Sequence, residues 1–135
     1  MRHALVVDNN DFYRKVLSEF LGTEGYRVSA VEDGRAALDC LGRERPDLLV
    51  LDLIMPKVDG IQVCRRVKSN PRMKEIPVII LSGVLVEDLG NLETIGADAF
   101  VAKMPLDRLL PTLRNVIRRL GEGCEAPLVD GFEGM

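Results

Sequence analysis

Short apolar runs alternate with amphipathic segments along most of the chain. Strands buried on both faces are near-continuous apolar runs, and residues 47–52 (DLLVLD) have the clearest pattern of this kind. The five expected strands are residues 4–8, 27–31, 47–52, 77–82 and 99–103. Their starts lie about 20–30 residues apart, which leaves room for a helical crossover between parallel strands.

Apolar residues recur at helical spacing between these strands. In the first such segment they occupy positions 12, 16, 17, 20 and 21. The five expected helices are residues 11–21, 34–41, 61–68, 86–94 and 108–120. The fourth is weak because Gly90 lies inside it, and Asp107 is the expected N-cap of the last.

Alternating strands and helices predict an α/β fold with a doubly wound, five-stranded parallel sheet and helices on both faces. We expect one domain over residues 1–120. Residues 121–135 contain four glycines and a proline without periodicity, so we expect a tail or a truncated linker there.

Composition narrows the function classes. The chain has 135 residues and a net charge of only −3, which argues against nucleic-acid binding by this domain. No apolar run reaches the ~18 residues of a membrane span, and no signal peptide is evident, so we expect no membrane contact and a cytoplasmic location. Cys40, Cys64 and Cys124 are scattered, and His3 is the only histidine, so neither a disulfide framework nor a histidine metal site is predicted.

Four of the predicted strands end in polar residues: Asp8, Asp52, Ser82 and Lys103. Each alone would most often be structural, but parallel strands bring their carboxyl ends to one edge, where ligands bind. Two neighbouring carboxylates repel unless a cation joins them, and oxygen ligands suit Mg²⁺ or Mn²⁺. Asp52 could then act as a carboxylate nucleophile, with Lys103 and Ser82 holding the oxygens of a transferred phosphoryl group.

These residues lie in motifs that resemble the receiver domain of two-component response regulators. Residues 51–56 (LDLIMP) with Asp59-Gly60 look like the family's phosphoacceptor loop, and residues 81–83 (LSG) are similar to its switch hydroxyl and the small residue after it. Residues 96–100 (GADAF) place Phe100 three residues before Lys103, as in the family. The resemblance covers about residues 3–120 and implies the flavodoxin-like strand order 2-1-3-4-5.

The resemblance implies a bacterial signalling phosphoacceptor rather than an enzyme. Asp52 would receive a phosphoryl group from a histidine kinase or a histidine phosphotransfer protein. Asp8, Asn9, Asp52 and the backbone carbonyl of Ile54 would bind Mg²⁺.

Family roles follow for three more residues. Gly83 would leave room for the phosphoryl group, and Ser82 and Phe100 would switch the face formed by the fourth helix, the fifth strand and the last helix. That face is also a candidate surface for a homodimer.

Two positions depart from the family pattern. Asn9 stands where a second acidic residue is usual, which removes one negative charge and predicts weaker Mg²⁺ affinity; nearby Asp11 is expected to start the first helix. Pro105 is displaced by one residue from its usual place after the lysine, so the bond from Lys103 to Met104 is either an ordinary trans peptide or part of a reshaped loop.

Two other functions are compatible with this architecture. A pseudo-receiver would use the fold only for protein interaction, and the altered metal position favours it. A nucleotide-binding domain or a phosphatase is disfavoured, because no glycine-rich phosphate loop follows the first strand and Asp52 lacks a DxD spacing. Basic residues after the third helix, such as Lys68 and Arg72, are interpreted as a solvated face, with a docking surface as the alternative.

Overall fold

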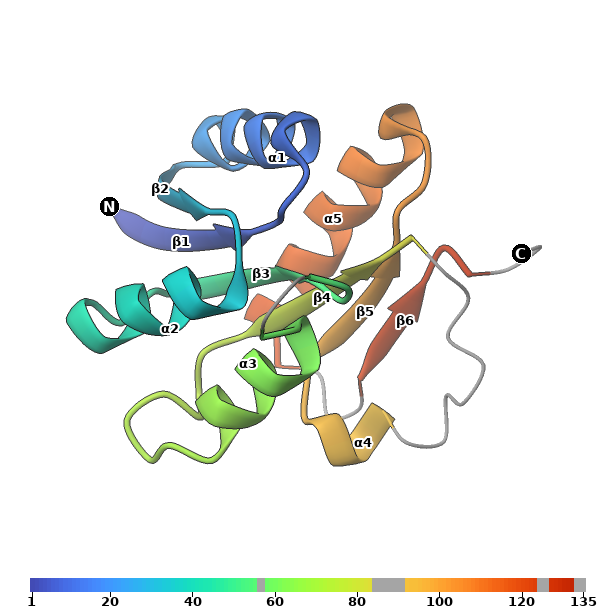
Figure 1. The fold of residues 1–135 in the computed structure, drawn as a ribbon. Helices are drawn as coiled ribbons and strands as arrows, with labels where there is room; N and C mark the ends of the chain where they lie inside the picture. The colour runs from blue at the N-terminus through green and yellow to red at the C-terminus, as the bar shows by residue number, and fades with distance from the viewer. Residues whose placement is uncertain (56–57, 84–91, 124–126, 133–135) are drawn as a thin grey trace.

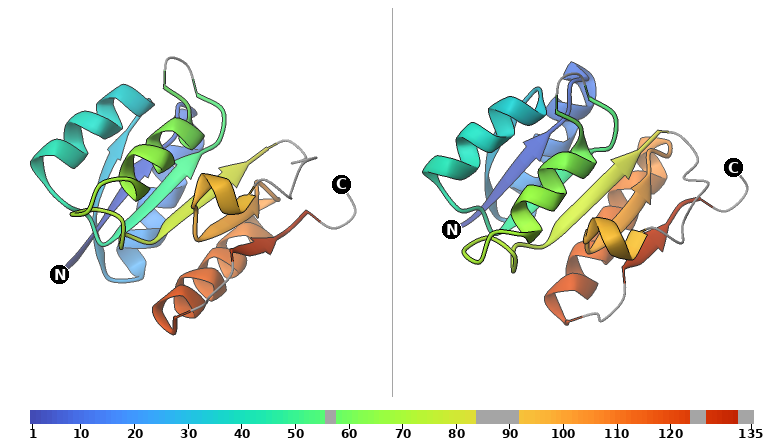
Figure 2. Two further views of the ribbon diagram at one scale, coloured as in Figure 1. Left: turned by 90° about the horizontal axis from the view of Figure 1, so that it is seen from below. Right: turned by 60° about the horizontal axis from the view of Figure 1, so that its bottom comes forward.

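The chain folds into a parallel sheet between two layers of helices (Figures 1 and 2). The structure is a computed structural model and describes residues 1–55, 58–83, 92–123 and 127–132. The strands are β1 Arg2–Val7, β2 Tyr26–Val31, β3 Leu48–Asp52, β4 Val78–Ser82, β5 Ala99–Ala102 and β6 Leu128–Asp130. The helices are α1 Asp11–Thr23, α2 Gly34–Arg43, α3 Gly60–Lys68, α4 Leu92–Ile95 and α5 Leu106–Gly121.

The strand order is β2-β1-β3-β4-β5-β6, and every pairing is parallel. The predicted α/β class and the order of the first five strands are therefore confirmed. The number of strands is not, because residues 128–130 add a sixth strand beside β5. This three-residue run is too short to show periodicity, so the sequence pattern did not reveal it.

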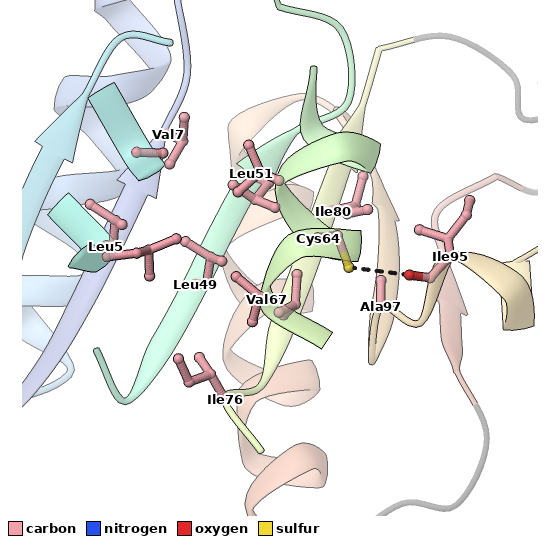
Figure 3. Packing of buried hydrophobic residues seen from close by; sticks show 14 of the residues in the cluster. Leu5, Val7, Leu49, Leu51, Cys64, Val67, Ile76, Ile80, Ile95 and Ala97 are labelled. Carbon is pink, nitrogen blue, oxygen red and sulfur yellow. Dashed lines mark hydrogen bonds between the residues drawn. The ribbon is translucent and has the colours of Figure 1, made fainter. Parts of the chain in front are cut away.

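Alternate residues of each central strand point to opposite helical layers, and two hydrophobic clusters result. Leu5, Leu49 and Ile80 belong to the cluster that α2 and α3 cover (Figure 3). Val6 and Val50 belong to the cluster that α1 and α5 cover. All residues of β3 and β4 are buried, which explains why both strands are apolar apart from their last residue.

Several predicted boundaries shift in the structure. The last helix begins at Leu106 rather than at residue 108, and its N-cap is Pro105, so the expected cap at Asp107 is wrong. Proline fixes φ near the value that the turn into a helix needs, which explains the earlier start. For the predicted helix 86–94, residues up to 91 lie outside the described residues, and α4 covers Leu92–Ile95.

The sequence suggested that Lys68 belongs to a solvated face, but its ammonium group is bound by groups of the protein. Its ammonium group donates to the carbonyl oxygens of Lys74 and Ile76 and to Asp98 Oδ2, at 2.8–3.0 Å. Asp98 Oδ2 also accepts from the Val78 N–H, so this cluster fixes the start of β4. Among the described residues, no helix is long and apolar enough to cross a membrane.

Candidate phosphoacceptor site

Asp52 ends β3 at the carboxyl edge of the sheet, and the loop after it is held close to the strand. The Leu53 N–H continues the β-ladder by donating to the Leu81 carbonyl at 2.8 Å. The chain then returns, and the Gly60 N–H donates to the Leu53 carbonyl at 3.1 Å. Both ends of the loop between β3 and α3 are therefore held beside the backbone of Asp52.

Gly60 is required for that return. A Cβ at this position would lie 2.3 Å from the Asp52 carbonyl oxygen, a distance that no side chain tolerates. Asp59 caps α3 by accepting from the Gln62 N–H, and the Gln62 side chain accepts from the Asp59 N–H. The Asp59-Gly60 pair of the sequence motif therefore has a local structural function as well.

Asp8 follows β1 directly and is almost completely buried. Its Oδ1 accepts from the Asn10 N–H at 2.8 Å, and its backbone carbonyl accepts from Arg14 Nη1 at 2.8 Å. Asn10 in turn caps α1 by accepting from the Tyr13 N–H. The predicted start of the helix at Asp11 is confirmed.

Lys103 follows β5 and reaches both carboxylates. Its Nζ lies 2.9 Å from Asp8 Oδ2 and 3.4 Å from Asp52 Oδ2. The Lys103 N–H donates to the Ser82 carbonyl at 2.8 Å, which continues the pairing of β5 with β4 beyond its end. Lys103 is thus the cation between two aspartates that would otherwise repel each other.

The aromatic ring of Tyr13 also contacts this lysine. Lys103 Nζ lies 4.4 Å from the centre of the ring, within the range of a cation–π interaction. Only 12% of the lysine side chain is exposed. Sequence reasoning missed Tyr13, because an aromatic residue in the first turn of a helix carries no local signal of a contact with a lysine ninety residues away.

The protonation of Asp52 reflects these surroundings. Burial raises the pKa of the Asp52 carboxyl above its ordinary value, the positive charge of Lys103 opposes this rise, and the charge of Asp8 adds to it. A hydrogen bond from the Ile54 N–H also favours the charged form. Burial is the largest of these effects on the pKa, so the folded protein pays a desolvation cost to keep Asp52 ionised.

The remaining predicted residues surround this cluster. Ser82 is the last residue of β4 and is buried, and Gly83 lies over the lysine stem, since a Cβ there would be 3.9 Å from Lys103 Cδ. Phe100 is fully buried in the cluster beneath α2 and α3. Asn9 and the Ile54 side chain are exposed at the same edge.

The oxygen donors of the site fit a hard divalent cation. Asp8 Oδ2 is buried and accepts no hydrogen bond from the described residues, although Lys103 balances its charge. The second carboxylate, Asp52, lies at the same lysine. Within the described ranges, no three carboxylate, imidazole or thiol side chains gather, so an ion here would also need backbone, amide or water oxygens.

The Lys103–Met104 peptide bond is trans, as are all peptide bonds of the described residues. The Met104 N–H donates to the Ala102 carbonyl at 2.9 Å, and Pro105 caps α5. The displaced proline of the sequence thus begins a helix. The first of the two outcomes considered from the sequence is the correct one.

Comparison with known proteins agrees with this arrangement. The family model of the response regulator receiver domain matches residues 4–114. A response regulator MprA from Mycolicibacterium vanbaalenii is 37% identical over 118 residues, which cover 85% of this chain and 50% of that protein. The chain spans about half the length of the curated relatives it matches.

Solved structures give the same result. The receiver domain of a signal transduction histidine kinase from Syntrophus aciditrophicus superposes with a TM-score of 0.76 at 30% identity, covering 93% of this chain and 95% of that one. The response regulator TrrA from Thermotoga maritima, in complex with Mg²⁺-BeF, superposes with a TM-score of 0.76 at 28% identity, covering 89% and 99%. The chain therefore belongs to the family of response regulator receiver domains.

Proposed function

We propose that Asp52 is the phosphoacceptor of a two-component or phosphorelay system. The observation that carries the proposal is the placement of its carboxylate at the sheet edge, 3.4 Å from Lys103 Nζ and beside the second buried aspartate, Asp8. An ionised carboxylate needs no general base, because it is already a nucleophile.

The transfer begins from a phosphorylated histidine of the kinase or phosphotransfer protein. An Asp52 carboxylate oxygen forms a bond to phosphorus, the phosphorus–nitrogen bond breaks, and its electron pair returns to the imidazole. Lys103 and Ser82 would hold oxygens of the transferred group, and Gly83, where a Cβ would lie 3.9 Å from Lys103 Cδ, would leave space above the lysine stem. Lys103 would offset part of the negative charge before and after the transfer, because its ammonium group already lies within 3.4 Å of two carboxylates.

The proposed metal ligands are Asp8, Asp52, the amide oxygen of Asn9 and the backbone carbonyl of Ile54. Mg²⁺ or Mn²⁺, when bound, supplies positive charge to the transferring phosphoryl oxygens. The solved structure of TrrA, a protein of the same family, is a complex with Mg²⁺-BeF. The exposed Asn9 brings no charge to this set, so we expect weaker Mg²⁺ binding than with aspartate at this position.

Phosphorylation would change the surface that α4, β5 and α5 form. Ser82 and Phe100 lie on β4 and β5, and Ile80, in β4, pairs with Phe100. A shift of Ser82 toward a phosphoryl group would therefore move the end of β4, the strand that pairs with the strand of Phe100. A homodimer through this surface is part of the same proposal, and it would require β6 to leave the edge of β5 with which it pairs.

The test uses beryllofluoride, which mimics a bound phosphoryl group, together with Mg²⁺. Amide NMR shifts near Asp52, Ser82 and Phe100 are expected for the wild type and not for Asp52→Asn. Asn9→Asp restores the negative charge, so its amide shifts should appear at a lower Mg²⁺ concentration than those of the wild type. A wild type that shows no shifts at saturating Mg²⁺ would instead support the pseudo-receiver.

A further inference from the structure

The carboxyl-terminal segment of the chain is a built part of the sheet. Its strand, β6, pairs in parallel with β5, with Ala99 opposite Leu128 and Val101 opposite Asp130. The Leu128 N–H donates to the Asp98 carbonyl at 3.0 Å, which adds a hydrogen bond before the start of β5. Figure 2 shows β6 alongside β5 at the edge of the sheet near α4.

Side chains at both ends of the segment dock onto the hydrophobic clusters. Leu128 packs against the cluster under α1 and α5, and Phe132 packs against the cluster under α2 and α3. Strict alternation would place residues 128 and 132 on the same face. Gly131, between β6 and Phe132, has a φ of +85°, and this left-handed conformation breaks the alternation.

Gly131 also touches the loop that follows Lys103. A Cβ at this position would lie 2.7 Å from Met104 Cε and 3.2 Å from Ala102 Cβ. The segment therefore covers the end of β5 and the first residue after the site lysine. A side chain at position 131 would be strained because of the positive φ, whereas the flexible end of the Met104 side chain can move aside.

The edge that β6 covers would otherwise be a good template for another chain. All four residues of β5 (AFVA) are apolar, and each is at most 1% exposed. An open apolar edge presents unpaired N–H and C=O groups, and proteins protect such edges with short or charged strands. β6 has only three residues and ends in Asp130, so it is a poorer template than the strand it covers.

We propose that residues 127–132, by pairing with β5 of the same chain, block the β5 edge and so prevent a second copy of this chain from pairing with it. A second copy reaches β5 only after the segment leaves. This goes beyond the proposed function, because it assigns the occupant of the edge and requires no phosphoryl group. Once β6 has left, the unpaired N–H and C=O groups of β5 would pair with an extended strand of that second copy.

The test compares three full-length proteins without any phosphodonor: wild type, Gly131→Val and Val129→Ala. Val129 is the matched control because its side chain is 40% exposed and no left-handed conformation is required there. Amide hydrogen exchange should show protected β6 amides in the wild type and in Val129→Ala. In Gly131→Val we expect protection of β6 to fall about tenfold, since a β-branched residue disfavours the left-handed conformation, while β3 and β4 stay protected.

Sedimentation velocity then tests the consequence for the edge. The wild type and Val129→Ala should remain monomeric at concentrations at which Gly131→Val self-associates. Unprotected β6 amides in the wild type would overturn the proposal. It would equally be overturned if Gly131→Val lost β6 protection and stayed monomeric, because the segment would then not be what keeps a second copy away.

Discussion

Replacing Lys103 by methionine tests the electrostatic arrangement of the site. The substitution keeps most of the aliphatic stem and removes the charge that lies 2.9 Å from Asp8 and 3.4 Å from Asp52. At an effective dielectric constant of about 20, a charge pair at the longer distance gains ~5 kcal/mol. The cost of removing these groups from water offsets much of this attraction.

Breaking a buried ion pair by removing one partner costs about 3–5 kcal/mol. We expect Lys103→Met to lower the free energy of unfolding at neutral pH by about 3 kcal/mol, the low end of that range, because Asp52 can relieve the repulsion by taking up a proton. Asp52→Asn alone should raise stability at neutral pH, since it removes a buried charge. The double variant should show a coupling of about 1–3 kcal/mol between the two positions.

The pH dependence follows from the sign of the pKa shift. The pKa of Asp52 is raised in the folded protein, so its carboxylate destabilises the fold increasingly as pH rises through the folded-state pKa. Without Lys103 the rise is larger. The stability difference between wild type and Lys103→Met should therefore be greatest at neutral pH and shrink as the solution is acidified.

Urea unfolding followed by circular dichroism, at several pH values, gives these free energies. Equal stability of the wild type and Lys103→Met at neutral pH would refute the reasoning. So would an Asp52→Asn effect of the same size in both backgrounds, because the two charges would then not interact.

Three further predictions concern single positions. Gly60→Ala should destabilise the fold by about 1–3 kcal/mol in thermal or urea unfolding and displace Asp52, because the new Cβ meets the Asp52 carbonyl oxygen at 2.3 Å. Cys64 should resist alkylation in the native state even at pH 9, as mapped by mass spectrometry, because burial raises its pKa to about 12. Tyr13→Leu should slow labelling of Asp52 by a small phosphodonor by about 2- to 30-fold, since the cation–π contact with Lys103 is worth ~0.5–2 kcal/mol.

Each of these has a control within the chain. Gly22→Ala should stabilise by up to about 1 kcal/mol, because this helical glycine has nothing within 4 Å of a new Cβ. Cys40 is half-buried and should be alkylated before Cys64. Tyr13→Phe keeps the ring and should label like the wild type; an equal loss in both Tyr13 variants would contradict the cation–π argument.

Much of the fold follows from local sequence patterns. The buried strands β3 and β4 are continuous apolar runs, and parallel connection by helices then places Asp8, Asp52, Ser82 and Lys103 at one edge. The strand positions were predictable because burial on both faces leaves little choice of residue type. The predicted roles of Asn9, Gly83 and Phe100 came from resemblance alone and stay predictions.

Other features had no local signal. Lys68 looked like part of a basic face, yet it binds carbonyl groups and Asp98 from a distant part of the chain. Tyr13 is one more aromatic residue in a helix until Lys103 is placed against its ring. Such contacts depend on which elements become neighbours, and helical periodicity does not record that.

The sequence pattern by itself determined the α/β class and the set of polar residues at the strand ends, and the family resemblance implied the order of the first five strands. Tertiary structure decided how those residues are paired: Lys103 bridges two aspartates, and burial sets the direction of the Asp52 pKa. It also decided the place of residues 128–130, which form a strand only because β5 offers them an edge. The physical reason is that periodicity reports burial along one element, whereas pairing and charge balance arise between elements.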